Sequence, residues 1–287
     1  MEELLGEYVP IDEWAGGAIK WLRTELRPLW DFLRDLLLSA YEGLEYLLNL
    51  APSWVMVLAL GLLALLARNW RFGLFALVSL ALVDIMGYWQ HTMQTLAMVL
   101  VAVLVAVAVA IPIGIGAARS QVLSAIVRPV LDFMQTMPAL IYVLLAVFIF
   151  RVGVVPGIVA TIIFAMPPAI RLTELGIRQV DREVVEAGHA FGSPPGAILR
   201  QIQLPLAMPS IMAGVNQVIM LALSMVVLGG FVGAPGLGQE VTAAIRRVDI
   251  GWGIEAGLSV VILAIYLDRL TAAIGARSTV ARLAKVA

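Results

Sequence analysis

Residues 181–205 read DREVVEAGHAFGSPPGAILRQIQLP and form the longest polar interval between two apolar runs in the second half of the chain. The first eleven residues favour a helix. Its apolar residues recur at helical spacing: Val184, Val185, Ala187 and Phe191. Gly192 then fits a helix C-terminus, because no Cβ opposes a left-handed backbone. Ser193 is a suitable N-cap and Pro194 a suitable first helical residue, so a second helix is predicted to begin there and to end at Pro205. The interval predicts an amphipathic helix–turn–helix elbow between two membrane-length segments.

The elbow resembles the EAA motif of bacterial ABC importer permeases, EAA-x3-G-x9-I-x-L-P. The matching residues are Glu186, Ala187, Gly188, Gly192, Ile202, Leu204 and Pro205. Every spacing fits, and the one departure is Gly188, where the family usually has alanine; glycine there should loosen the first helix by up to about 1 kcal/mol. In that family the loop inserts into a groove on a cytoplasmic ATPase subunit, so the resemblance implies an ATPase-coupling role. The alternative is an amphipathic loop on the bilayer surface.

The composition is that of an integral membrane protein. Of 287 residues, 61% are hydrophobic and 14% are charged, whereas soluble proteins are about 25% charged. The absence of cysteine excludes disulfides and thiolate metal sites, and two histidines, His91 and His189, argue against a histidine-based metal site. The chain contains no GxxxxGK[ST] phosphate loop. We therefore predict no enzyme activity and no cofactor in this chain, with ATP and Mg²⁺ bound by a partner ATPase.

The apolar runs predict an all-α membrane fold, because about 20 residues cross 30 Å of hydrocarbon. We predict seven spans, at 53–67, 72–88, 94–117, 129–150, 153–170, 209–231 and 252–272. The first two are separated only by four residues, 68–71, so a tight helical hairpin is an alternative for them. The predicted organisation is an amphipathic segment (1–52), two accessory helices (53–90), a core (91–275) that the resemblance identifies as a type I ABC importer permease core, and a tail (276–287).

Basic residues in short loops predict the orientation. With the N-terminus outside, the inner loops and tail hold Arg68, Arg71, Arg119, Arg128, Arg171, Arg178, Arg182, Arg200, Arg269, Arg277, Arg282 and Lys285. The outer loops then hold only Arg151, Arg246 and Arg247. This asymmetry predicts a cytoplasmic elbow and C-terminus, in the cytoplasmic membrane of a bacterium or archaeon.

Residues 1–52 are acidic, with apolar residues at helical spacing from Trp14 to Leu37. Tryptophan favours the membrane interface, so an amphipathic helix lying in that interface is one interpretation. A helix packed on the outside of the bundle is the other. The start of the chain lacks the basic, uninterrupted apolar pattern of a secretory signal.

Three polar residues, Asn216, Gln217 and Ser224, lie inside the sixth predicted span. Polar groups at this depth usually face the bundle interior, so they are candidates to line a translocation pathway or to form interhelical hydrogen bonds. Asn216 and Ser224, eight residues apart, are expected to share a face. Pro112, Pro138 and the pair at 167–168 predict kinks that shape the bundle.

Residues 229–239 contain five glycines, and we expect them to let the chain turn at the outer mouth. GAPGLGQEV (233–241) resembles the outer loop of glycine betaine/proline-type ABC permeases, and DFMQTMP (132–138) resembles the start of their core helix. This resemblance implies a binding-protein-facing role for Gly233, Pro235, Gly236 and Gly238. It covers about residues 92–272.

The resemblance implies the permease subunit of an importer for glycine betaine or a related quaternary amine or compatible solute. Its implied partners are a cytoplasmic ABC ATPase, an extracytoplasmic substrate-binding protein and a second permease copy, in a membrane and without nucleic acid. Proline, choline and trimethylamine oxide remain open as substrates. An ion-coupled secondary transporter is a further alternative, although we find neither an intramembrane acid pair nor matching half-repeats; a non-transporting scaffold is another.

Overall fold

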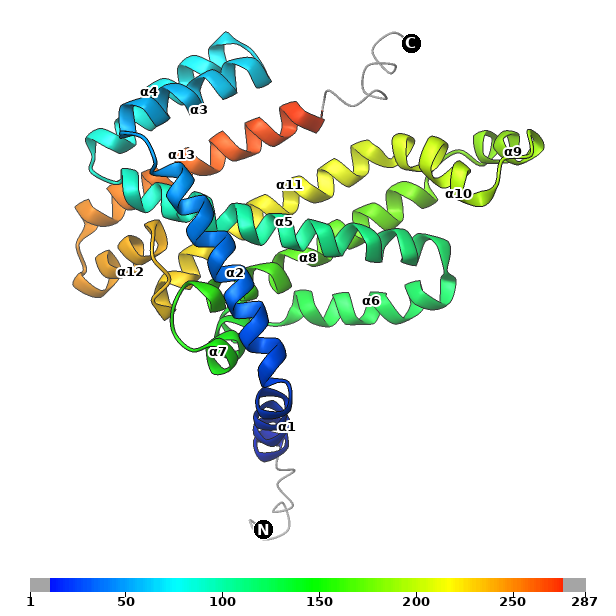
Figure 1. Ribbon diagram of the computed structural model, residues 1–287, viewed down its shortest axis with the longest axis horizontal. Coiled ribbons are helices and arrows are strands. Elements are labelled where there is room, and N and C mark those ends of the chain that lie inside the picture. Colours follow the sequence, from blue (N-terminus) through cyan, green and yellow to red (C-terminus); the bar gives the residue numbers. More distant parts are fainter. Residues whose placement is uncertain (1–10, 276–287) are drawn as a thin grey trace, which may run out of the picture.

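The computed structural model describes residues 11–275, and these residues form helices without a β-strand (Figure 1). The helices are α1 (Ile11–Glu25), α2 (Arg27–Leu48), α3 (Ser53–Ala67), α4 (Trp70–Ile85), α5 (Trp89–Arg119), α6 (Gln121–Thr136), α7 (Ala139–Phe150), α8 (Val154–Arg178), α9 (Arg182–Ala190), α10 (Pro195–Ile198), α11 (Leu204–Gly229), α12 (Leu237–Arg247) and α13 (Ile250–Gly275). A π-helical turn, Leu199–Gln203, joins α10 to α11. The predicted tail, 276–287, lies outside the described residues.

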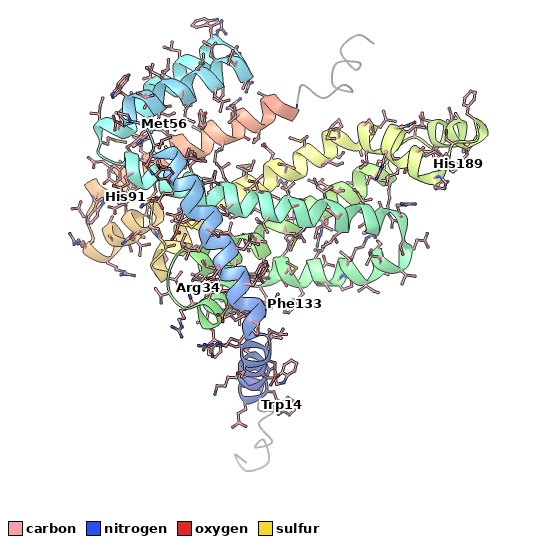
Figure 2. All side chains as sticks on the ribbon, in the orientation of Figure 1. Trp14, Arg34, Met56, His91, Phe133 and His189 are labelled. Atoms are coloured by element: carbon pink, nitrogen blue, oxygen red, sulfur yellow. The ribbon has the colours of Figure 1, made fainter. Side chains whose placement is uncertain are left out.

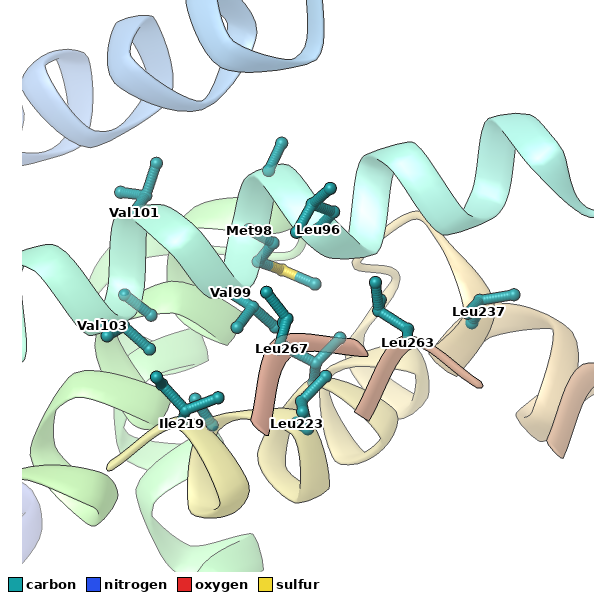
Figure 3. Packing of buried hydrophobic residues seen from close by; sticks show 14 of the residues in the cluster. Leu96, Met98, Val99, Val101, Val103, Ile219, Leu223, Leu237, Leu263 and Leu267 are labelled. Atoms are coloured by element: carbon teal, nitrogen blue, oxygen red, sulfur yellow. The ribbon is translucent and has the colours of Figure 1, made fainter. Parts of the chain in front are cut away.

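The core is built from α5, α8 and α11, with α13 packed alongside. Figure 3 shows Val99 of α5, Leu223 of α11 and Leu263 of α13 meeting in this core. Small residues allow the helices to approach closely, as is common in membrane bundles. A Cβ on Gly114 of α5 would lie 2.6 Å from the Cβ of Thr173 on α8. A Cβ on Gly214 of α11 would lie 3.0 Å from the Cα of Ala169.

The predicted number of seven spans is not confirmed. Among the described residues, four helical segments are long and apolar enough to cross a membrane: α5, α8, the continuous segment Pro195–Val232, and α13. Two bent helix pairs, α2 with α3 and α6 with α7, raise the number to six if each pair is one span. The predicted first two spans form α3 and α4, of 15 and 16 residues. At 1.5 Å per residue each is about 23 Å long, shorter than the hydrocarbon layer.

The tight hairpin expected as an alternative for the first two spans is confirmed. Asn69 caps α4 by accepting a hydrogen bond from the Phe72 N–H at 2.9 Å. A Cβ on Gly73 would lie 2.7 Å from the Cβ of Leu65, so only glycine allows α3 and α4 to pack this closely near the turn.

The predicted span at 129–150 is not one continuous helix. The chain divides there into α6 and α7, which are bent by 98°. The cause is Pro138, whose ring disfavours a helical conformation in the preceding residue. Met137 is accordingly extended, with φ −67° and ψ 136°. The prolines at 112, 167 and 168 lie inside α5 and α8 without ending either helix.

Residues 11–48 of the acidic N-terminal segment form α1 and α2, whereas residues 1–10 lie outside the described residues. Helix α2 crosses the bundle against α5, α7 and α8 (Figure 1). Leu37 and Tyr41 are buried, and the Trp30 ring meets the Phe150 ring edge-on at 5.8 Å. Helix α2 therefore fits the second interpretation, a helix packed on the outside of the bundle. The opposite flank of α1 and α2 leaves several large apolar side chains exposed, including Trp14, Trp21 and Phe32.

Candidate functional site

The elbow projects from one end of the bundle, where His189 marks its tip (Figure 2). Its first helix, α9, begins after Asp181, whose carboxylate accepts a hydrogen bond from the Glu183 N–H at 3.0 Å. Gly192 has φ +76°, so the predicted left-handed turn is confirmed. The second helix begins one residue later than expected, with Pro194 rather than Ser193 as its N-cap.

The prediction that Pro205 ends the second helix is wrong. The helical segment runs without interruption from Pro195 to Val232. A proline ring normally clashes with the carbonyl four residues earlier and removes one hydrogen bond. Here the Leu204 N–H bonds to the carbonyl of Leu199, five residues back, and this wider π-turn accommodates Pro205. The second arm of the elbow, which consists of α10 and the π-turn, is therefore continuous with the core helix α11. The first arm is α9.

Gly188 lies in the contact between the two arms of the elbow. It is buried, and a Cβ there would lie 2.8 Å from Cδ1 of Ile202 and 3.4 Å from Cγ1 of Ile198. The glycine thus lets α9 lie close against the second arm. Phe191, by contrast, is 89% exposed at the tip, and Val184 is 42% exposed. The elbow is a packed unit whose exposed surface carries apolar residues, such as Phe191, beside charged ones, such as Glu183 and Glu186.

The remaining motif residues divide between this contact and the surface. Glu186 and Ala187 are exposed, whereas Ile202, Leu204 and Pro205 are partly buried on the second arm. Glu186 also lines a cavity of about 320 Å³ with Arg119, Arg178 and Arg182. This cavity separates α9 from the ends of α5 and α8, so the elbow joins the bundle beside a basic recess.

Sequence reasoning missed a buried carboxylate, Glu174 of α8, which joins α6 to α8. Its side chain is 5% exposed. Its Oε1 accepts hydrogen bonds from Ser124 Oγ at 2.7 Å and Arg128 Nη2 at 2.9 Å, and Arg178 Nε lies 3.1 Å away. Arg178 also donates to the Ala117 carbonyl at the end of α5, 2.8 Å away. The charged residues of α8 at 171, 174 and 178 share one helix face, and that spacing was the available signal.

The polar residues of α11 do not form one face. Asn216 Nδ2 donates to Asp268 Oδ1 of α13 at 2.7 Å, and Thr271 Oγ1 donates to Asn216 Oδ1 at 2.7 Å. The expectation that Asn216 and Ser224 share a face is wrong, because a separation of eight residues rotates them by about 80°. Gln217 and Ser224, seven residues apart, are both exposed on one stripe of α11.

Three acidic groups of the helical bundle, Glu174, Asp268 and Asp84, each have a hydrogen-bond partner on another helix. Glu174 is held by two arginines and Asp268 by Asn216. Asp84, at the end of α4, accepts a hydrogen bond from Ser53 Oγ at 2.9 Å. These carboxylates tie helices together, which does not favour the ion-coupled alternative.

More than half of the chain matches a known family of membrane transport proteins. Residues 110–279 match the family described as the binding-protein-dependent transport system inner membrane component. The chain belongs to this permease family. Solved inward-facing structures of the MetNI methionine ABC transporter resemble the permease with a TM-score of 0.55 and 23% sequence identity. That match covers 66% of this chain and 93% of the solved chain, and at this identity it supports the type I importer fold alone.

Curated relatives match the permease over most of its length. It is 44% identical over 263 residues to the glycine betaine transport system permease protein OpuAB of Bacillus subtilis (strain 168), covering 92% of this chain and 93% of that protein. It is 45% identical over 267 residues to the glycine betaine/proline betaine transport system permease protein ProW of Escherichia coli (strain K12), covering 93% and 75%. These relatives confirm the resemblance inferred from the elbow and the glycine-rich loop.

The glycine-rich loop of the permease lies at the bundle end opposite the elbow and returns the chain to the core. Gly233 and Gly236 have φ +78° and +105°. The Leu237 N–H donates to Thr95 Oγ1 of α5 at 2.8 Å. A Cβ on Gly238 would lie 2.4 Å from the Val226 carbonyl oxygen. These glycines therefore provide both the turn and the close packing; Pro235 is half-buried between them.

Proposed function

We propose that this permease is the transmembrane subunit of an ATP-driven importer for glycine betaine or a related quaternary amine. The observation that carries the proposal is the identity of 44–45% to two named glycine betaine permeases over more than nine-tenths of the chain. A separate ATPase hydrolyses ATP, a separate binding protein delivers the solute, and this chain forms the membrane pathway without enzyme activity of its own.

The elbow is the proposed ATPase-binding surface. Phe191 is the best anchor, because large aromatic side chains that enter a partner's groove dominate binding energy at interfaces and because it is 89% exposed. Glu186 and Ala187 lie on the same exposed helix. Gly188, Gly192 and Ile202 set the turn and the contact between the two arms. Leu204 and Pro205 join the second arm to the core, where Leu204 packs against the cluster formed by Ile177, Leu199 and Ile211. These residues therefore shape the ATPase-binding surface rather than form it.

Continuity of the second arm with α11 supports a simple mechanism. Nucleotide-driven movement of the ATPase displaces the elbow, and the uninterrupted segment Pro195–Val232 carries that displacement into the core. The Glu174 cluster holds α6, α8 and the end of α5 together near the elbow. The helices at this end therefore move as a group between inward-open and outward-open states.

The exposed stripe of α11 is the proposed pathway lining. Gln217, Met220 and Ser224 are exposed on a helix that otherwise packs into the core. A second copy of the permease would place two such stripes opposite each other and enclose a polar path. We assign Asn216 to interhelical hydrogen bonding rather than to this lining, because its amide is bound to Asp268 and Thr271 of α13.

The glycine-rich loop is the proposed docking side for the binding protein, with Gly233, Pro235, Gly236 and Gly238 setting its shape. The loop and the elbow lie at opposite ends of the bundle (Figure 1). The excess of basic residues near the elbow supports a cytoplasmic elbow and C-terminus and an external N-terminus in the cytoplasmic membrane.

Reconstitution tests the proposal. Proteoliposomes containing the permease, its ATPase and its binding protein should accumulate glycine betaine only with ATP inside. Glu186→Lys and Gly192→Trp should each reduce ATPase binding and uptake together. Normal assembly and normal uptake in both variants would refute the elbow's role.

Inhibitors distinguish the alternative functions. Uptake that survives vanadate but collapses with an uncoupler would identify a secondary transporter instead. A permease that never supports substrate-stimulated ATP hydrolysis would be a scaffold.

The substrate assignment needs a separate comparison. Quaternary ammonium groups are held in aromatic cages by cation–π attraction, and we place that cage in the binding protein. Competition of labelled glycine betaine uptake by choline, proline and trimethylamine oxide ranks the solutes. Preference for proline over every quaternary amine would overturn the assigned class while leaving the importer mechanism intact.

A further inference from the structure

Helix α2 crosses the bundle beside α7 (Figure 1). A basic cavity of about 580 Å³ lies between α1, α2 and the C-terminal end of α7; Arg34, one of its lining residues, is labelled in Figure 2. Five cationic side chains line it: Lys20, Arg23, Arg27, Arg34 and Arg151. The only acidic residue in its lining is Asp31, which is 3.7 Å from Arg27. The cavity therefore carries a strong net positive charge, although the N-terminal segment as a whole is acidic.

The cations of this cavity remain available to a ligand. Within the described part of the chain, Lys20, Arg34 and Arg151 have no carboxylate within 4.0 Å. Arg23 lies over the Phe148 ring at 5.4 Å, which positions its guanidinium without neutralising it. All five residues are exposed. Mutual repulsion among these cations is relieved when an anion enters.

The surroundings of the cavity are apolar. Phe148 and Val152 are exposed beside it at the end of α7, and Trp30 and Phe150 form its inner wall. On the opposite flank of α1 and α2, the helices expose Trp21, Phe32 and other large apolar side chains. A helix with Lys and Arg on one face and Trp, Phe and Leu on the other is typical of the membrane interface.

The location of the cavity also fits a lipid headgroup. Arg151 lies three residues before the start of α8, and the elbow follows the other end of that helix. Twenty-five residues separate the two ends, about 37 Å at the α-helical rise. The cavity is therefore at the membrane surface opposite the elbow, at the depth where phospholipid phosphates lie.

We propose that this cavity binds the phosphate of an anionic phospholipid in the leaflet opposite the elbow. The arginines and Lys20 contact the phosphate, while the exposed apolar residues of α7 contact the acyl chains. Bound lipid then joins α1 and α2 to α7 and sets the position of the N-terminal helices. The lipid is preferred to an acidic protein surface because the flanking apolar stripe matches hydrocarbon rather than a polar interface rim.

Native mass spectrometry of the purified full-length permease tests the proposal, with phosphatidylglycerol compared against phosphatidylcholine. The variant Arg23→Gln/Arg34→Gln should lose about tenfold or more of the preference for phosphatidylglycerol, since each cation near a membrane surface contributes about 1 kcal/mol. The matched control is Arg246→Gln/Arg247→Gln, which removes two exposed arginines at the same end of the bundle. The control should keep the preference. Equal loss in both variants, or no loss in either, overturns the proposal.

Three additional measurements distinguish lipid binding from misfolding, from free-anion binding and from protein binding. Thr24→Glu places a carboxylate in the cavity without removing a cation, so it should lower phosphatidylglycerol binding even if the double variant folds poorly.

Excess inorganic phosphate should not displace the lipid from the permease. Displacement would assign the site to a free anion. Loss of binding-protein capture with lipid retention unchanged would assign it to an acidic protein. The readout needs neither substrate nor ATP, so it is independent of the transport proposal.

Discussion

Two glycines of the elbow have opposite structural requirements. Gly192 has φ +76° in open space, whereas Gly196 sits in a helix, also in open space. We expect Gly192→Ala to destabilise the elbow by about 1–2 kcal/mol, because a left-handed conformation is unfavourable for residues with a Cβ. Gly196→Ala, the matched control, should be neutral or stabilising. The rate at which limited proteolysis cleaves the elbow measures the stability of both variants. Equal cleavage rates for Gly192→Ala and Gly196→Ala would contradict the assigned role of Gly192.

Gly188 requires a different test, because its constraint is packing. Gly188→Ala gains up to about 1 kcal/mol of helix propensity, but its Cβ meets the flexible end of Ile202, which must rotate aside. We expect ATPase binding to be preserved and elbow stability to change little. Gly188→Leu cannot be accommodated and should prevent assembly. Loss of assembly with alanine itself would show that close backbone approach is required.

The tip residue Phe191 is expected to contribute to binding rather than to stability. Phe191→Ala removes a side chain that is 89% exposed, so the permease should unfold at an unchanged temperature while its affinity for the ATPase falls about tenfold or more. Phe231→Ala, an exposed phenylalanine at the other end of the bundle, is the control and should bind the ATPase normally. Pull-down with the partner ATPase, alongside thermal unfolding, distinguishes the two effects.

At the scale of helices, the Glu174 cluster is the main polar tie between α6 and α8. Glu174→Ala leaves Ser124, Arg128 and Arg178 without their shared acceptor. Because the two arginine side chains are 59% and 33% exposed and can regain water, we expect a loss of about 1–3 kcal/mol. The control is Asp132→Ala, which breaks the ion pair between Asp132 and Arg171. These two side chains are 67% and 40% exposed, respectively. Exposed pairs contribute about 1 kcal/mol or less. In detergent, the thermal unfolding temperature should fall clearly more in Glu174→Ala than in Asp132→Ala. Equal decreases would show that Glu174 does not stabilise the contact between α6 and α8 more than Asp132 does.

The two helix-breaking prolines illustrate how context decides an element. Pro138 separates α6 from α7 with a bend of 98°, whereas Pro205 lies within a continuous helix through a π-turn. Both residues carry the same helix-breaking signal in the sequence. Their outcomes differ because the segment carrying Pro205 is held against α9 at the Gly188–Ile202 contact and against α8 where Ser210 meets Gly176. Met137, before Pro138, is instead extended.

For the whole molecule, the proposed homodimer makes a direct prediction, because the chain contains no cysteine. Ser224→Cys on the exposed stripe of α11 should form a disulfide-linked dimer in membranes under mild oxidation. Val78→Cys, 63% exposed on α4, is the control and should remain monomeric on a denaturing gel. Cross-linking of Val78→Cys but not Ser224→Cys would place the second copy against α4 instead.

Hydropathy, helix-capping residues and motif spacing are sufficient to predict the all-helical membrane class, the elbow with its left-handed glycine, and the permease family. For α3 and α4 they left two alternatives, separate spans or a tight hairpin. These signals act within a few turns of chain. The packing of helices, by contrast, determines that the chain continues as a helix through Pro205, that Gly188 is buried, and which residues of other helices bind Glu174 and Asn216. The partners on other helices lie 46 to 55 residues away in the chain, and only Arg178, four residues from Glu174, is local. Local propensity carries no information about such contacts, because they exist only once separate helices pack together.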